Sequence, residues 1–120
     1  MPIDNHWVIY ISNMLTVADE LFAALADPTR RSIFERLVRD GEQTVRALTE
    51  AGAVSQPAVS KHLRVLKLAG LVRDRPEGRL VHYRAEPAGL ATLAGWLRFY
   101  AAFWDEKLDR LEDLLKRMDQ

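Results

Sequence analysis

The stretch Ser55-Gln-Pro-Ala-Val-Ser-Lys-His-Leu-Arg-Val-Leu-Lys-Leu-Ala-Gly-Leu71 decides the fold, because it carries signals for both ends of one helix. Ser55 is a good N-cap, since its hydroxyl can accept one of the first-turn N–H groups that lack a partner. Pro57 falls in the first turn, where a missing N–H costs nothing. Gly70 suits the position just after the last turn, so we predict a helix over about 55–69.

The two faces of this predicted helix differ in chemistry. Val59, Leu63 and Leu66 recur every three or four residues and form one apolar stripe. The opposite face carries short polar groups and cations: Gln56, Pro57, Ser60, Lys61 and Arg64. Such a face suits the DNA major groove, where Gln and Ser can read base edges and Lys and Arg meet phosphates or guanine. A solvated face of an ordinary amphipathic helix would show the same pattern, so the helix alone leaves both interpretations open.

The distribution of charge favours the DNA interpretation. The chain as a whole has a formal net charge of zero. Residues 55–84, however, hold seven basic residues against two acidic ones, and the balance is acidic over both 1–54 and 105–120. A basic middle between acidic flanks is typical of a DNA-facing surface on a neutral protein. A chance cluster on a solvated face is the alternative.

Upstream, the sequence predicts two longer helices and one short one. Thr16 can cap a helix through about Ala26, and Asp27-Pro28 reads as the N-cap and first residue of a second helix that ends near Gly41. We expect Ile33, Leu37 and Val38 of the second helix to face inward. Its arginines could touch the DNA backbone, although a solvated or ion-paired role is favoured; they are Arg30, Arg31, Arg36 and Arg39.

A helix-turn-helix follows. Thr44 begins a short helix through Glu50, and Ala51-Gly52 stops it just before Ser55. Two short helices joined by a glycine-containing turn form this motif, and the second of them is the recognition helix.

The next segment reads as a β-hairpin, or wing, over about 71–84. Two β-rich runs, 71–75 and 80–84, flank the turn residues Pro76-Glu77-Gly78-Arg79. Arg75 and Arg79 flank the tip, where cations can contact phosphates or enter the minor groove. A hairpin that only closes the core, with solvated arginines, is the alternative.

A long helix over about 87–118 completes the chain. Its first half is apolar nearly all round, so it must be covered on more than one side, and a second copy of the chain is the most economical cover. Its aromatic residues could instead line a ligand pocket: Trp96, Phe99, Tyr100, Phe103 and Trp104. We predict a homodimer with these interface residues: Leu21, Leu25, Leu93, Leu97, Tyr100, Trp104, Leu108 and Leu111.

Together these elements predict a mainly α fold with a small β-hairpin (α+β), a winged helix-turn-helix with long N- and C-terminal dimerisation helices. Residues 16–120 form its single domain. Residues 1–15 are an extension of uncertain structure: a short helix or strand, or an upstream addition if translation starts at Met14. They lack a signal-peptide pattern, and no apolar run reaches the ~20 residues of a membrane span. We therefore expect a cytoplasmic protein.

Several function classes are excluded or disfavoured by residue content. The chain has no cysteine, which excludes disulfides, thiolate metal sites and thiol redox sensing. No catalytic motif or phosphate-cradling loop stands out, so we predict no enzymatic activity and no cofactor. A helical protein-interaction module that has lost DNA binding is the remaining competitor.

With these elements in place, the chain resembles the ArsR family of winged-helix bacterial repressors. Three separated motifs carry the resemblance in the right order: residues 22–37, residues 55–63 (Ser-Gln-Pro-Ala-Val-Ser-Lys-His-Leu) and residues 66–72 (Leu-Lys-Leu-Ala-Gly-Leu-Val). The resemblance implies a homodimer that binds a dyad-symmetric operator and represses transcription. It places Gln56, Pro57, Ser60 and Lys61 at base-reading positions and Thr44 near the DNA backbone. His62 also matches, but we expect it to be packed and hydrogen-bonded.

The chain departs from the metal-sensing members of that family. The thiolate-bearing motif would fall on Thr44-Val45-Arg46, and the other common site needs histidines that residues 105–120 lack. The three histidines are scattered, with no i,i+4 pair for a metal: His6, His62 and His82. We therefore predict no metal site, and any inducer would be of another class.

Overall fold

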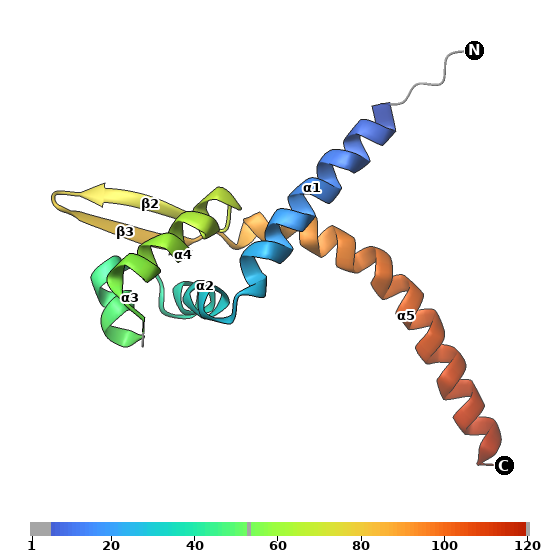
Figure 1. Ribbon diagram of the computed structural model, residues 1–120. Coiled ribbons are helices and arrows are strands. Elements are labelled where there is room, and N and C mark those ends of the chain that lie inside the picture. Colours follow the sequence, from blue (N-terminus) through green and yellow to red (C-terminus); the bar gives the residue numbers. More distant parts are fainter. Residues whose placement is uncertain (1–5, 53, 120) are drawn as a thin grey trace.

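A computed structural model describes residues 6–52 and 54–119; for residues 6–8 and 10–14 it describes the backbone only. Helices and strands follow one another along the chain (Figure 1) as α1 (His6–Ala26), α2 (Pro28–Asp40), β1 (Gln43–Thr44), α3 (Val45–Ala51), α4 (Gln56–Leu68), β2 (Val72–Glu77), β3 (Leu80–Ala85), the 3₁₀ turn η1 (Pro87–Leu90) and α5 (Ala91–Met118). This is the expected mainly α fold with a small antiparallel sheet.

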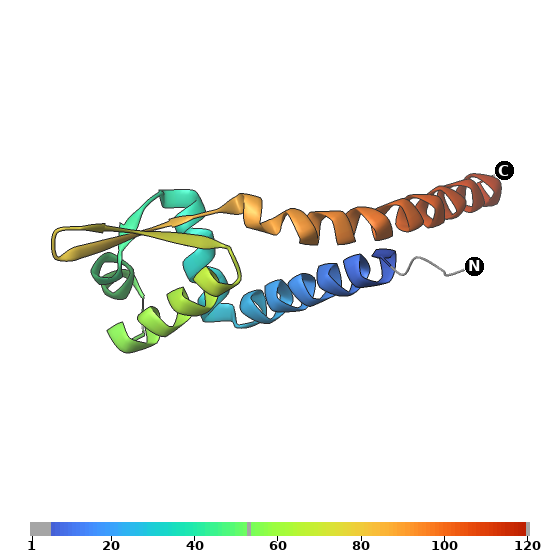
Figure 2. The same ribbon diagram turned by 90° about the horizontal axis from the view of Figure 1, so that it is seen from above.

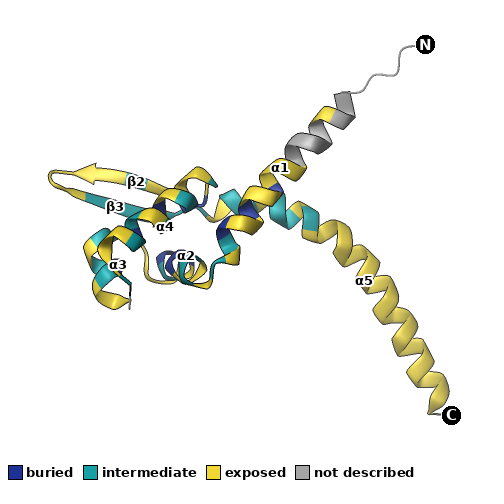
Figure 3. Ribbon diagram, viewed as in Figure 1, coloured by how far each residue is buried: buried dark blue, intermediate teal, exposed yellow. Residues whose placement is uncertain are grey.

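The core lies where α1, α2 and α4 meet the base of the hairpin. The apolar stripe predicted on α4 is fully buried there, together with residues of α1, α2, β2 and the turn before β2 (Figure 3): Leu21, Leu37, Val59, Leu63, Leu66, Leu71 and Val72. One face of α4 is therefore held inside the domain, and the opposite face is left to the outside.

Local capping signals set the two ends of α2. The Asp27 side chain accepts a hydrogen bond from the Arg30 backbone N–H at 2.9 Å, and this bond is the largest cause that lowers the pKa of Asp27. Gly41 ends α2 with a φ of 84°, as predicted.

The expected inward position of Val38 is wrong: Val38 is 51% exposed, and Phe34 is buried instead. Phe34 lies between Ile33 and Leu37 on the buried stripe, whereas Val38 falls off it.

The first helix is longer than predicted. It begins at His6, so Thr16 lies inside the helix and not at its N-cap. No glycine or proline occurs between residues 6 and 26, and nothing in this run ends the helix. The uncertain extension therefore continues α1 from residue 6 onward, while residues 1–5 lie outside the described residues.

The sheet has the order β1-β3-β2. The hairpin loop is shorter than predicted, because Pro76 and Glu77 continue β2 and pair with Val81 and Leu80. Pro76 is accepted because β2 is an edge strand. The two-residue loop begins at Gly78, whose φ of 61° suits the first central position of a type II′ turn. Strand β1, which the sequence did not suggest, adds two residues beside β3.

Two helical arms leave the domain on the side opposite the hairpin tip (Figures 1 and 2): the N-terminal part of α1 and most of α5. The expected C-terminal helix begins as η1 and continues as α5 to Met118. Leu90 and Leu93 pack against the core, whereas α5 is exposed from Leu97 onward (Figure 3). At 1.5 Å per residue α5 is ~42 Å long, so most of it lies beyond the core. None of the described helices is long and apolar enough to cross a membrane.

Candidate nucleic-acid interface

The N-terminus of α4 is built as predicted. The Ser55 hydroxyl accepts a hydrogen bond from the Ala58 backbone N–H at 3.3 Å, and Pro57 occupies the first turn. The hydroxyl of Ser55 is therefore engaged in the cap. Gln56 and Pro57 are exposed at the helix start, where a recognition helix meets base edges.

The outer face of α4 continues from this start. Lys61 and Arg64 are exposed, and Ser60 is half-buried beside them. Because the opposite face is locked into the core, these side chains project from a helix whose rotation is fixed. The face thus combines an amide, a hydroxyl and two cations on one rigid element, which suits a duplex groove.

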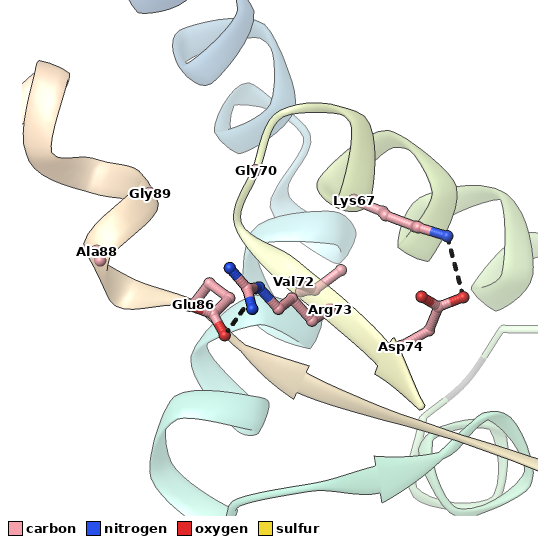
Figure 4. A pocket seen from close by; sticks show the side chains of 8 residues that line it. All are labelled: Lys67, Gly70, Val72, Arg73, Asp74, Glu86, Ala88 and Gly89. Carbon is pink, nitrogen blue, oxygen red and sulfur yellow. Dashed lines mark hydrogen bonds and ion pairs between the residues drawn. The ribbon is translucent and has the colours of Figure 1, made fainter. Parts of the chain in front are cut away.

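Ion pairs divide the basic residues of 55–84 into two groups. Four are paired with carboxylates (Figure 4 shows the first two pairs): Lys67 with Asp74 at 3.0 Å, Arg73 and Arg84 with Glu86 at 3.3 Å each, and Arg75 with Glu42 and Glu77. Lys61, Arg64 and Arg79 have no carboxylate within 4.0 Å in the part of the chain that the structure describes. The unpaired cations therefore lie on the outer face of α4 and at the hairpin tip.

Arg75 is held inside the protein's own charge network. Its guanidinium lies 2.5 Å from Glu42 and 3.1 Å from Glu77, and His82 also lies within 3.2 Å of Glu77. The hydrogen bond between Arg75 and Glu42 is the largest cause that raises the pKa of Arg75, and it lowers the pKa of Glu42. Arg75 therefore fixes the hairpin to the segment before β1, and its charge is already compensated. The expected phosphate contact at the tip rests on Arg79.

Two further residues singled out in the sequence also have local roles. The Thr44 hydroxyl accepts a hydrogen bond from the Ala47 backbone N–H at 3.1 Å and caps α3. His62 is half-buried, which fits the expected packing, and its buried Nδ1 has no hydrogen-bond partner among the described residues.

The arginines of α2 are held by the protein itself in two ways. Arg36 and Arg39 pair with Asp40, as the ion-paired interpretation expects, whereas Arg30 and Arg31 bind backbone carbonyl oxygens. Arg30 donates to the carbonyl oxygens of Ala24 and Ala23 at 2.5 and 2.8 Å, and Arg31 donates to Leu25 at 2.8 Å. These bonds satisfy carbonyls at the C-terminus of α1, which a helix leaves without partners.

The residues expected at a dimer interface fall into two classes. Leu97, Tyr100, Trp104, Leu108 and Leu111 are exposed on the arm formed by α5, whereas Leu25 and Leu93 are half-buried. Leu21 is fully buried within a single chain, so a partner cannot reach it in this conformation, and we remove it from the expected interface. The apolar spacing along α1 does not tell a residue of the chain's own core from one that faces a partner, and Leu21 belongs to the core cluster.

The aromatic residues of α5 pack in pairs along the arm. Trp96 meets Phe22 of α1 edge-to-face with ring centroids 5.1 Å apart, and Tyr100 lies 4.7 Å from Trp96. Phe99 is 74% exposed. These rings therefore join α5 to α1 near the domain and form an apolar surface beyond it. No cluster of three or more potential metal ligands occurs among the described residues.

Comparisons with known proteins agree with this geometry. Residues 25–75 match a family model described as a helix-turn-helix domain. The HTH-type transcriptional regulator Rv2034 of Mycobacterium tuberculosis is 52% identical over 75 residues, which cover 62% of this chain and 69% of Rv2034. The structure is similar to an ArsR-like transcriptional regulator from Rhodococcus sp. RHA1, with a TM-score of 0.69, 34% identity and coverage of 85% of this chain and 95% of that one.

A second solved structure bears on assembly. The homodimeric winged helix-turn-helix DNA-binding domain Mb0332 of Mycobacterium bovis matches with a TM-score of 0.58 and 25% identity, over 85% of this chain and 88% of that one. Taken together, these matches favour a DNA-binding regulator over a protein-interaction module.

Proposed function

The chain belongs to the ArsR family of winged helix-turn-helix transcriptional regulators, and on this premise we propose that it is a homodimeric repressor of a dyad-symmetric operator. The observation that carries the proposal is the outer face of α4, where Lys61 and Arg64 remain without carboxylate partners among the described residues while four neighbouring cations are paired. A helix whose cations were all paired with carboxylates would gain little binding free energy from DNA phosphates, whereas the cations of this face are available to attract them. A dimer bound over a promoter would exclude the polymerase.

Each residue of the interface has a role in this proposal. Gln56 and Ser60 read base edges from the N-terminal half of α4, with Pro57 beside them, and Lys61 and Arg64 meet phosphates or guanine. Arg79 at the hairpin tip contacts phosphates or the minor groove. Thr44 and Ser55 bring the N-termini of α3 and α4 close to the DNA backbone.

A second copy of the chain would cover the apolar side of α5 that the single chain leaves exposed. Large apolar side chains are exposed along α5 from Leu97 to Met118, and an exposed apolar patch marks an interaction surface. Pairing through this helix and α1 would set the two copies of α4 into successive major grooves, ~34–36 Å apart.

The direct test is binding of the purified protein to the DNA upstream of its own gene and to a random duplex, each at two salt concentrations. Tighter binding to the upstream DNA would support a repressor that controls its own promoter. Equal, weak binding to both duplexes would contradict that model and move the function to a remote operator or a protein partner.

Gln56→Ala is expected to lower sequence preference more than overall affinity. The amide offers both a donor and an acceptor to base edges but carries no charge to attract phosphates. Operator binding should weaken by roughly 1–3 kcal/mol, while binding to random DNA should stay close to the parent value. Titration of both duplexes measures the difference, and an equal loss on the two would refute base reading by Gln56.

Arg79→Ala is expected to weaken binding to every sequence and to lower the salt slope by about 1 for each phosphate that the arginine neutralises. Arg75→Ala is the matched comparison at the same hairpin. Because Glu42 and Glu77 already compensate Arg75, its removal should change DNA affinity less and should lower thermal stability instead. Binding and melting curves of both variants measure this, and the opposite order would show that Arg75 is the wing contact.

A further inference from the structure

The turn that follows α4 and the segment that precedes α5 meet through their backbones. Helix α4 ends in a Schellman motif, in which the Leu71 N–H donates to Leu66 O at 2.9 Å and the Gly70 N–H donates to Lys67 O at 3.0 Å. Just beyond it, the Glu86 N–H donates to Leu71 O at 2.7 Å. The turn that ends α4 is thus joined directly to the segment that begins η1 and α5.

Gly89 makes this junction unusually close. A Cβ atom at Gly89 would lie 2.1 Å from the carbonyl oxygen of Gly70 and 2.9 Å from its carbonyl carbon. The backbone of Gly89 is not left-handed, so alanine would suit its conformation and only the contact forbids it. The opposing atoms are backbone, which cannot rotate aside as a side chain can. The whole of η1 would have to move away from the end of α4.

Figure 4 shows where this contact lies. Gly70 and Gly89 line one cavity of about 550 Å³ at the junction, together with the Lys67–Asp74 and Arg73–Glu86 ion pairs. Lys67 is paired with Asp74, and Arg73 is paired with Glu86. The cavity provides open space on one side of the junction, so the junction has room to shift when it is forced apart.

We propose that Gly89 is a positioning residue for DNA recognition: its contact with Gly70 sets the angle between α4 and α5. This inference rests on the proposed function. In a dimer held by α5, that angle determines the distance between the two recognition helices and therefore the half-site separation that the protein prefers. Ordinary contacts between carbon and carbonyl oxygen are about 3.3–3.6 Å, so a Cβ at Gly89 would displace η1 by at least ~1 Å.

The test compares Gly89→Ala with Gly95→Ala. Gly95 lies within α5 with no atom within 4 Å of an added Cβ, so Gly95→Ala adds the same methyl group without a clash. Because the chain has no cysteine, Leu68→Cys gives a single exposed thiol at the end of α4 for a spin label. The distance between the two labels in the dimer reports the separation of the recognition helices without any DNA.

We expect Gly89→Ala to shift the label distance by ~2 Å, about 1 Å from each copy, while Gly95→Ala leaves it unchanged. A panel of upstream duplexes, with the spacer between half-sites lengthened or shortened one base pair at a time, should show an altered optimum. Affinity at the natural spacing should fall by about tenfold or more, as expected for one misplaced base contact. Affinity for random DNA should be unchanged.

A folded Gly89→Ala dimer with the parent label distance and the parent spacing optimum would overturn the inference. If Gly89→Ala does not fold, Glu86→Ala tests whether the backbone contact or the ion pairs set the angle, because it removes the carboxylate that binds Arg73 and Arg84 and leaves the contact between Gly89 and Gly70 in place. The label distance and the spacing preference should then stay at the parent values, and a shift in either would overturn the inference. If the parent protein shows no preference for its upstream DNA, the model of a repressor that controls its own promoter fails, whereas the label distances still decide the role of Gly89.

Discussion

Replacing Leu108 with glutamate is expected to separate the two copies and to abolish operator binding in the same variant. Leu108 is 56% exposed in the single chain and lies in the middle of a seam that recurs every three or four residues along the α5 arm. The members of this seam are Leu97, Ala101, Trp104, Leu108, Leu111, Leu115 and Met118. Such spacing is typical of two helices packed along one another.

The size of the effect follows from burial. Covering a leucine side chain contributes about 1.5–3 kcal/mol, and the contribution is made once by each copy. Glutamate forfeits this gain and also places an unpaired carboxylate in the interface, which costs more. Since about 1.4 kcal/mol corresponds to a tenfold change, the dimer should weaken by more than ~100-fold. A monomer offers one recognition helix, so specific binding should disappear together with the dimer.

Sedimentation and DNA titration on one preparation check this prediction. Arg110→Gln is the matched control, because it changes the net charge by the same amount. It lies outside the seam and removes only an exposed pair with Glu106, which is worth little. The control should remain a dimer and bind DNA. A Leu108→Glu protein that stays dimeric would remove α5 from the interface.

Signals confined to a few neighbouring residues were enough to predict most element boundaries. Asp27-Pro28 and Ser55 to Pro57 start helices, and Gly41 and Gly70 end them, because each signal acts through a cap within one turn. The outer face of α4 was predictable for the same reason, since the buried stripe of a helix fixes which residues lie opposite it.

The features that the sequence did not reveal are those decided by distant parts of the chain. Strand β1 is two residues long and exists only because β3 lies beside it, so no local periodicity announces it. Arg75 is compensated by Glu42, which is far from it in sequence, and nothing in the hairpin sequence reveals that partner. The contact between Gly70 and Gly89 is likewise tertiary. The sequence of 55–84 contains seven cations, and the fold divides them into paired and unpaired groups.

The division into paired and unpaired cations predicts a large difference in DNA binding, and in its salt dependence, between two double variants. Lys61→Ala with Arg64→Ala should reduce affinity for operator and random DNA together and should flatten the salt dependence of binding. Both side chains are exposed on the outer face of α4 without carboxylate partners in the described part of the chain. The dimer would lose four cations, and at about 0.9 in slope for each neutralised phosphate the salt slope should fall by roughly 3 to 4.

Lys67→Ala with Arg84→Ala is the matched double variant, because it also removes one lysine and one arginine from the same segment. Lys67 is paired with Asp74, and Arg84 shares Glu86 with Arg73, so both side chains are already bound to carboxylates. Its salt slope should remain close to that of the parent protein, and its affinity should change little. Titrations of both proteins over a series of salt concentrations measure the slopes. Equal slopes for the two double variants would mean that net charge alone attracts DNA and that the outer face of α4 is not its contact surface.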